Sequence, residues 1–204
     1  MLVGPKYKIC KRLGASVFEK CQTQKFQLAE ANSPRRTSRP KRGGGNDFGA
    51  QLLEKQKARF TYGLTESQFS RYVHESMEKK GSDSSVLLMI RLESRLDNVV
   101  FRAGFVKTRR AARQLVSHGH IMVNGKRMNV PSFCVSMGDV ISIRPESKVS
   151  PLFANRAEVV AEIKTPAWME LEDNGFAAKI VSAPTTSATE APFNAATIIQ
   201  FYSR

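Results

Sequence analysis

Basic side chains are concentrated in the segment KTRRAARQLVSHGHIMVNGKRMN, residues 107–129, where their types and spacing suit phosphate binding. The segment holds six Lys or Arg and two His, and no Asp or Glu occurs from Phe101 to Gly138. Arginine suits this chemistry because its planar guanidinium can bind two phosphate oxygens at once. We interpret the segment as a surface for a polyanion; the alternative is an ordinary solvated surface.

A short helix is expected to position the first of these cations. Thr108 is suited to cap a helix over residues 109–118, and Gly119 is suited to end it. At helical spacing the Ala, Leu and Val side chains lie on one arc, which predicts the buried face. A separate arc carries Arg109, Arg110 and Arg113.

A β-hairpin is expected to follow. The pair Asn124-Gly125 predicts a two-residue type I′ turn, because both central residues of such a turn have positive φ. This turn pairs Ile121 with Met128 and leaves Lys126 and Arg127 at the exposed tip. A turn and strand within residues 136–143 complete a compact α+β module of helices, hairpin and strand.

Three helices are expected upstream of this module. The first spans residues 47–60, and the second follows a capping-box pattern at residues 65–68. Tyr72 in the second helix has core spacing, although stacking on a base is an alternative. The third is expected to run from Ser84 or Ser85 to Ala103. Its basic edge is expected to comprise Arg91, Arg95 and Arg102, with Glu93 and Asp97 on the other side.

Charge is distributed unevenly along the 204 residues, whose formal net charge is +14. Residues 1–50 hold eleven basic and three acidic side chains, and residues 82–150 hold eleven and five. Residues 151–204 hold four and six. Two separate basic regions predict two surfaces that face nucleic acid, and the acidic end is expected to meet a basic protein.

Other classes of protein fit the sequence poorly. The longest apolar run, residues 86–90, is too short for a membrane span, and residues 1–11 lack a signal-peptide stretch. We therefore expect a reducing compartment and no membrane partner. The scattered cysteines Cys10, Cys21 and Cys134 make a disulfide framework unexpected.

The basic stretch NSPRRTSRPKRGGGN, residues 32–46, has no large apolar side chain. Such a segment cannot bury enough surface to offset its ordering entropy. We expect residues 1–46 to form an irregular arm that becomes ordered on phosphate; a solvated linker is the alternative.

The stretch SRLDNVVFRAGFVKTRRAARQLVSHGHIMVNGKRMNVPSF, followed by GDVISI, resembles the RNA-binding domain of small-subunit ribosomal protein four, bacterial or organellar type. The likeness continues upstream in DFGAQLLEKQKARFTYG and ESQFSRYV, and downstream in PAWMELE and IIQFYSR. It therefore extends, in order, over nearly the whole chain.

The resemblance implies an α+β fold in four parts. These are a basic arm (1–46), a helical domain (47–91), an α+β domain (92–180, with the RNA-binding module at about 94–150) and a C-terminal segment (181–204) that packs back on the helical domain.

The implied function is structural. Members of this family bind 16S-type rRNA, nucleate assembly of the small subunit and influence decoding accuracy. Ribosomal protein five of the small subunit is the implied neighbour, near the point where messenger RNA enters. A cytoplasmic small subunit is expected, with an organellar ribosome left open. No homo-oligomer, cofactor or catalytic residue is expected.

The residues expected to contact RNA come from the arm, the helical domain and the module. They are Arg35, Arg36, Arg39, Lys41, Arg42, Lys57, Arg71, Arg95, Lys107, Arg109, Arg110, Arg113, His118, His120, Asn124, Lys126 and Arg127.

The chain departs from the family pattern in two places. Many relatives carry PGQHG where this chain has PRRTSRPKRGGGN, so RNA contacts there cannot be transferred by position. Some relatives hold zinc through four N-terminal cysteines. Here only Cys10 and Cys21 are present and Tyr7 stands at a ligand position, so we predict no bound zinc.

Two rival classes of protein explain fewer of these features. The RNA-binding module recurs in pseudouridine synthases and some tRNA synthetases, but no catalytic motif such as a phosphate-binding Gly-rich loop is present here. Asp97, four residues after Glu93 on a helix surface, is better explained as a solvated charge than as a catalytic group. A DNA-compacting protein would not need an ordered module with one basic face.

Overall fold

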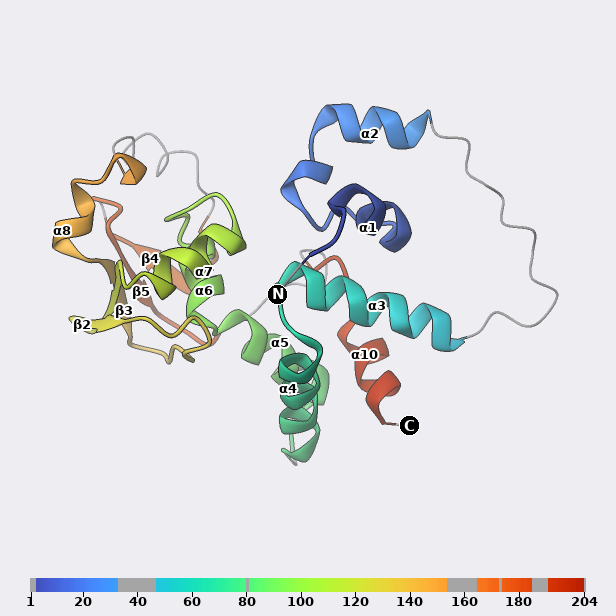
Figure 1. Cartoon of the computed structure of the whole chain (residues 1–204). Helices are drawn as coiled ribbons and strands as arrows, with labels where there is room; N and C mark the ends of the chain where they lie inside the picture. Colours follow the sequence, from blue (N-terminus) through green and yellow to red (C-terminus); the bar gives the residue numbers. More distant parts are fainter. Residues whose placement is uncertain are drawn as a thin grey trace. The chain divides into compact units, whose positions relative to one another are not determined.

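The computed structural model describes residues 3–32, 47–79, 81–153, 165–172, 174–184 and 191–203. It consists of helices and one five-stranded antiparallel sheet, which confirms the α+β class (Figure 1). The chain divides into two compact units. The helical unit comprises Met1–Leu88 and Ser187–Arg204, and the sheet unit comprises Met89–Thr186.

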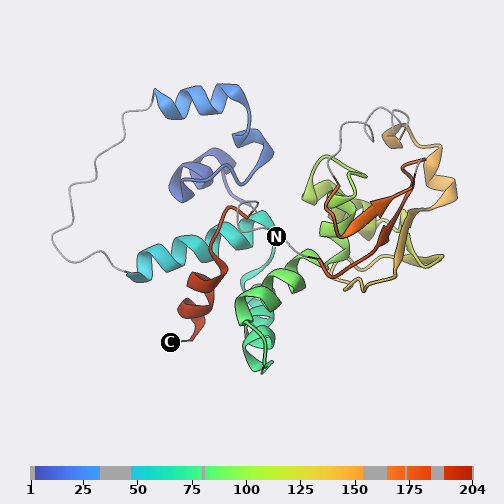
Figure 2. The same ribbon diagram turned by 180° about the vertical axis from the view of Figure 1, so that it is seen from behind.

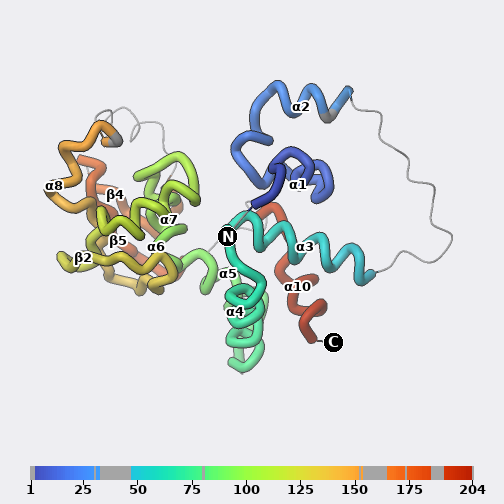
Figure 3. The backbone as a smooth tube through the Cα atoms, in the orientation of Figure 1, coloured from blue at the N-terminus to red at the C-terminus, as the bar shows by residue number. Residues whose placement is uncertain are grey.

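The helical unit is built from short helices joined by turns. Its elements are α1 (Lys6–Leu13), η1 (Glu19–Cys21), α2 (Gln24–Ala31), α3 (Asp47–Thr61), α4 (Glu66–Glu78), the first half of α5 (Ser84–Glu93) and α10 (Ala195–Tyr202). The C-terminal helix α10 packs against α3 and α4, and the tube in Figure 3 shows α10 beside α3.

The predicted second helix of this unit has the expected start and core. The Thr65 hydroxyl accepts a hydrogen bond from the Gln68 amide at 3.4 Å and so caps α4. Tyr72 is fully buried, together with Phe69 and Val73 on the same helix face. Tyr72 is therefore a core residue and is not available to stack on a base.

Glu66 connects three elements of the helical unit. Its carboxylate accepts hydrogen bonds from Lys55 Nζ on α3 at 2.7 Å and from the Tyr202 hydroxyl on α10 at 2.9 Å. Arg59 Nη1 donates to the other carboxylate oxygen at 3.2 Å. The ammonium of Lys55, a buried residue, also lies 4.7 Å from the centre of the Phe201 ring. These contacts hold the C-terminal helix to α3 and α4.

The Glu66 contacts predict an acid-sensitive contribution to stability. Partial burial raises the pKa of Glu66, but the hydrogen bonds from Lys55 and Tyr202 and the nearby positive charges outweigh it, so the net pKa is lowered. The charged carboxylate thus stabilises the fold above its unfolded pKa of 4.5, and this contribution is lost as pH falls through the folded value.

We expect Glu66→Gln to lower the free energy of unfolding at pH 7, and the difference from wild type to narrow as pH falls below 4.5. Denaturant titrations followed by circular dichroism at several pH values measure this. Glu78→Gln, at an exposed position of the same helix, is the matched control. A difference from wild type that grew on acidification would contradict the prediction.

The N-terminal segment corrects one expectation. Residues 6–31 form α1, η1 and α2, so the prediction of an irregular arm is wrong for them. The reason is a small core that local composition did not reveal: Cys10, Cys21 and Phe26 are buried together, with Phe18 packed against them. Cys10 and Cys21 form a disulfide, contrary to the expected absence of one. Residues 33–46 of the predicted arm lie outside the described residues.

With so small a core, the folded state of residues 6–31 should depend on the disulfide. Removing a disulfide that closes a loop of this size costs about 2–3 kcal/mol. We expect reduction, or Cys10→Ser, to increase amide hydrogen exchange over α1 and α2 while α4 keeps its protection. Cys134→Ser, at the exposed free thiol, is the control and should change neither segment. Equal exchange with and without the disulfide would contradict this dependence.

The sheet unit carries the predicted hairpin and three further strands. Its helices are the second half of α5, α6 (Leu96–Arg102), α7 (Arg109–Ser117) and α8 (Pro145–Lys148), with the turn η2 (Pro151–Phe153). Its strands are β1 (Ile121–Val123), β2 (Lys126–Met128), β3 (Val140–Ile143), β4 (Met169–Leu171) and β5 (Ala177–Ile180). The strand order is β2-β1-β3-β5-β4, so β2 and β4 are the outer strands.

Helices α6 and α7 cover one face of the sheet. They lie nearer the viewer in Figure 1, and β4 and β5 come forward in the reverse view of Figure 2. The core between them is apolar because strand residues alternate: Ile121 and Val123 of β1 point inward, as do Ile141 and Ile143 of β3. Leu115 on α7 also belongs to this core.

The predicted long helix over residues 84–103 is interrupted. It ends at Glu93 and restarts at Leu96, with Arg95 in extended conformation between α5 and α6. The backbone there pairs with a distant segment: the Val135 amide donates to the Ser94 carbonyl at 2.8 Å, and the Leu96 amide donates to the Phe133 carbonyl at 2.9 Å. These pairings replace the helical hydrogen bonds and break the expected basic edge.

Candidate nucleic-acid interface

The hairpin forms with the predicted register. Ile121 pairs with Met128 and Met122 with Arg127, and Asn124 and Gly125 have φ of 50° and 76°. Directly paired residues project from the same face of a sheet. Arg127 therefore lies on the face opposite the core, whereas Lys126 pairs with Val123, whose side chain is buried in the core. Both cations are exposed on the outer strand β2.

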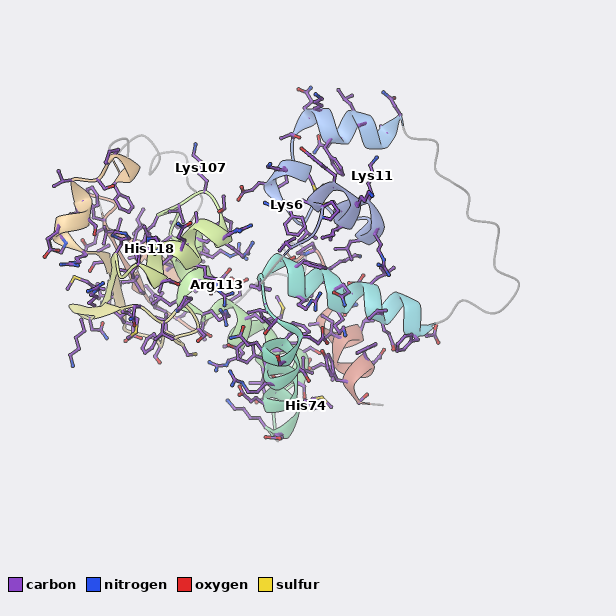
Figure 4. All side chains as sticks on the ribbon, in the orientation of Figure 1. Lys6, Lys11, His74, Lys107, Arg113 and His118 are labelled. Carbon is purple, nitrogen blue, oxygen red and sulfur yellow. A yellow bond between two sulfur atoms is a disulfide. The ribbon has the colours of Figure 1, made fainter. Side chains whose placement is uncertain are left out.

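Helix α7 begins where the sequence predicted and ends at Ser117, one residue before the predicted end. The Thr108 hydroxyl accepts a hydrogen bond from the Ala111 amide at 2.9 Å, and Gly119 follows the helix with a φ of 74°. Ala112, Leu115 and Val116 are buried, while Arg110 is exposed and Arg113 is half-buried. In Figure 4, Lys107 extends from the loop before α7, away from the rest of the unit.

The end of α7 and the hairpin meet at Arg127. Its Nη2 donates to the His118 carbonyl at 3.3 Å, and its guanidinium lies over Gly119, where an added Cβ would displace it. Glycine is favoured at this position mainly because its φ of 74° is strained for other residues. This contact places an exposed guanidinium beside the exposed His118.

His120 and Asn124 hold the module together through their side chains. The His120 ring Nδ1 lies 2.9 Å from the hydroxyl of the buried Ser147, which fixes the ring against α8. The side-chain Nδ2 of Asn124 donates to Asp139 Oδ1 at 2.8 Å. The side-chain Oδ1 of Asn124 accepts from the backbone amide of Val140 at 2.9 Å. Both residues were expected to contact RNA, and the structure gives each a clear part in positioning the hairpin.

Arg109 is directed into the unit rather than away from it. Its Nε donates to Asn98 Oδ1 at 2.8 Å, and its guanidinium lies 4.4 Å from the centre of the Phe101 ring. Asn98 in turn donates to the buried carboxylate of Glu93 at 2.8 Å. This network ties α7 to α6 and to the end of α5, so Arg109 differs in role from its exposed neighbour Arg110.

The expected RNA contact at Arg95 is contradicted by its burial. Arg95 is 0% exposed, and its guanidinium forms a two-point ion pair with Asp97: Nε donates to Oδ1 at 3.0 Å and Nη2 to Oδ2 at 2.7 Å. Arg102, the next member of the expected basic edge, donates to the Glu93 carboxylate at 2.9 and 3.1 Å. Asp97 and Glu93 are thus partners of these arginines rather than solvated charges.

Two expected contacts lie in the helical unit and five lie outside the described residues. Lys57 pairs with Glu54 at 2.7 Å, and the exposed Arg71 lies 3.5 Å from Glu75. Such ion pairs near the surface are weak and can be exchanged for phosphate. The contacts predicted in residues 33–46 are Arg35, Arg36, Arg39, Lys41 and Arg42.

The residues that the structure leaves best placed for phosphate form what we call the basic surface. It comprises Lys107, Arg110, Arg113, His118, Lys126 and Arg127.

The position of Arg144, the residue that immediately precedes α8, was not predicted from the sequence. The Arg144 amide donates to the His120 carbonyl at 2.9 Å, so Arg144 lies beside the histidine that the hairpin carries. Its side chain pairs with Glu146 at 2.7 Å, and this hydrogen bond lowers the pKa of Glu146. Only the long-range pairing of β1 with β3 brings this helix to the interface, and no local pattern indicates it.

The described ranges offer neither a metal-ligand cluster nor a membrane-spanning helix. No group of three or more His, Cys, Asp or Glu side chains is arranged there to hold a metal ion, and the absence of zinc stays a prediction. No helix among these residues is long and apolar enough to cross a membrane.

Comparison with known proteins agrees with the division into two units. A family model described as "Ribosomal protein S4/S9 N-terminal domain" matches residues 1–93, and one described as "S4 domain" matches residues 94–141. The "Small ribosomal subunit protein uS4" of Natranaerobius thermophilus is 40% identical over 205 residues, covering 98% of each chain. The protein of the same name from Roseiflexus castenholzii is 42% identical over 206 residues, covering 99% of this chain and 98% of its own.

The matches extend across both units, and the matching proteins are ribosomal proteins, not enzymes. The chain belongs to the small ribosomal subunit protein uS4 family, of the bacterial type.

Proposed function

We propose that this chain is a structural constituent of the small ribosomal subunit and binds 16S-type rRNA directly. The observation that supports this most is the basic surface, whose residues project from a folded module in a stretch without Asp or Glu from Phe101 to Gly138. The family membership supports the proposal as well, because relatives that match nearly the whole chain are named as proteins of the small ribosomal subunit.

The proposed mode of binding is recognition of RNA shape. Folded RNA presents phosphates and 2′-hydroxyls in a fixed arrangement, and proteins read that arrangement with cations on rigid elements. Here α7 is capped at its start and packed through Leu115, while the hairpin is held by Asn124 and His120. Rigid placement reduces the entropy lost on binding.

We also propose the finer roles that the resemblance implies. They are nucleation of small-subunit assembly, a contribution to decoding accuracy, and contact with ribosomal protein five of the small subunit in a cytoplasmic ribosome. The net charge of +14 supports early binding, because long-range attraction to RNA speeds association.

Two measurements test the proposal. The tagged chain, expressed in bacterial cells, should co-sediment with small ribosomal subunits. In filter binding, purified chain should prefer folded 16S-type rRNA to duplex DNA of equal length at the same salt concentration. Equal affinity for the two nucleic acids would favour a general polyanion binder and overturn the proposal.

A further inference from the structure

Helix α8 brings one acidic side chain, Glu146, close to the basic surface. From Asn98 to Ser150 the sequence contains two acidic residues, Asp139 and Glu146. The contacts of Asp139 explain its presence, because its carboxylate accepts from the Asn124 side chain and from the Ser136 amide, both at 2.8 Å. Glu146 belongs to α8 rather than to the hairpin, so its place beside a phosphate-binding surface needs another explanation.

The start of α8 is attached to the residue that precedes β1. The Arg144 amide donates to the His120 carbonyl at 2.9 Å, and the Ser147 hydroxyl lies 2.9 Å from Nδ1 of the same histidine. The rings of His120 and His118 are 5.9 Å apart, and Arg127 Nη2 donates to the His118 carbonyl at 3.3 Å. These contacts form an unbroken series from the hairpin to the residues on either side of the carboxylate.

Glu146 is held in place by Arg144. Arg144 Nε donates to one carboxylate oxygen at 2.7 Å and Nη2 to the other at 3.2 Å, so the two planar groups meet along one edge of the guanidinium. The pKa of Glu146 is lowered first by the hydrogen bond from Arg144 and also by the positive charge of Arg127. The carboxylate is therefore charged at neutral pH and lies within the electric field of both arginines.

The ion pair leaves part of Arg144 available to a phosphate. Its Nη1 forms no hydrogen bond among the described residues, and the Arg144 side chain is 37% exposed. A phosphate can bind the Nη1–Nη2 edge while the carboxylate keeps the Nε–Nη2 edge, because a guanidinium has five donors in a rigid fork. A phosphate that approaches from the side of Glu146, whose side chain is 67% exposed, meets a negative charge instead.

Stability gives little reason for this ion pair. Pairs between exposed side chains contribute little to folding, because water screens them and both side chains lose freedom. A carboxylate on a phosphate-binding surface also weakens the attraction to every polyanion. It improves selectivity, however, when the correct RNA places its phosphates away from the carboxylate and other nucleic acids do not.

We propose that Glu146 is a specificity-determining residue of RNA binding. It fixes Arg144 for one phosphate of the correct RNA and repels nucleic acids whose phosphates are placed differently. The inference rests on the proposed function and adds Arg144 to the residues that contact RNA. The basic surface supplies the attraction, and the carboxylate makes that attraction depend on the shape of the nucleic acid.

Two variants separate the parts of this proposal, and each has a matched control. Glu146→Gln removes the charge and keeps an oxygen that can accept from Arg144. Its control is Glu170→Gln, which removes the same charge from an exposed position on β4, at the opposite edge of the sheet from β2. Arg144→Gln removes the phosphate contact, and its control is Lys179→Gln, at the exposed position of β5 that pairs with Glu170. Circular dichroism melts establish that all four variants fold.

Filter binding of the full-length chain compares folded 16S-type rRNA with duplex DNA of equal length at several salt concentrations. Glu146→Gln should raise the affinity for duplex DNA by roughly two- to fivefold, the scale of one exposed charge interaction, and change the affinity for rRNA by less than about twofold. Arg144→Gln should weaken rRNA binding and lower the slope of log affinity against log salt by about 0.7–0.9. Both controls should keep the wild-type preference and slope.

The outcomes separate this inference from the proposed function. If Glu146→Gln changes the preference for rRNA no more than Glu170→Gln does, or if Arg144→Gln keeps the wild-type slope, the inference is overturned and RNA binding stands. If Glu146→Gln weakens rRNA binding and lowers the melting temperature together, the carboxylate only supports α8 and the inference is again overturned. If wild type does not bind rRNA, both fail together.

Discussion

Replacing Arg95 by methionine should destabilise the sheet unit by about 3–5 kcal/mol, because it leaves the Asp97 carboxylate buried without its partner. Methionine keeps most of the apolar stem, so the loss comes mainly from the charge rather than from a cavity. The fluorescence of Trp168, the single tryptophan, measures this directly, since its side chain is buried in the core of the same unit.

Two controls define the cause of that loss. Arg110→Met removes an exposed arginine and should change the free energy of unfolding by less than about 0.5 kcal/mol. Adding Asp97→Asn to Arg95→Met removes the unpaired charge and should restore part of the stability. An Arg95→Met chain as stable as wild type but weaker in RNA binding would return Arg95 to the interface and contradict the burial argument.

The prediction for Arg95 was wrong because the conformation of this residue is set by a distant segment of the chain. Local pattern favours one helix through residues 84–103, and on such a helix Arg95 would face solvent. The break at Ser94 and Arg95 is caused by pairing with residues 133–135, almost forty positions away. The helix propensities of residues 84–103 do not indicate that pairing. The prediction of one continuous helix was therefore wrong, and so was the prediction that Arg95 is exposed.

The hairpin and the start of α7 were predictable because their causes are local. Asn124 and Gly125 specify a turn by their own backbone preferences, and that turn sets the strand register. Thr108 likewise caps α7 through an amide only three residues away. The strands β4 and β5 carry no such local signal, and they form because β5 pairs with β3.

The N-terminal helices were missed for a related reason. The basic composition of residues 1–46 favoured an irregular arm without a core of its own, and this prediction is wrong for residues 6–31. The actual core uses Cys10, Cys21 and Phe26, whose proximity depends on a disulfide between two elements.

Neutralising the basic surface in two halves should show how RNA is held. Arg110→Gln with Arg113→Gln removes the helix cations, and Lys126→Gln with Arg127→Gln removes the hairpin cations, from positions outside the core. Removing one phosphate-binding cation lowers the slope of log affinity against log salt by about 0.7–0.9, so each pair should lower it by roughly 1.4–1.8. Filter binding to 16S-type rRNA at several salt concentrations measures both slopes.

The combined variant distinguishes one continuous interface from two independent ones. If α7 and the hairpin bind the same RNA together, the four substitutions should remove about three slope units and weaken binding far more than either pair. Leu115→Ala is the converse control: it should cost about 2–5 kcal/mol of stability, because Leu115 is 4% exposed, and leave the slope of the folded fraction unchanged. If one pair leaves the slope at the wild-type value, the element that carries that pair does not contact RNA. The binding surface is then reduced to the other pair together with Lys107 and His118.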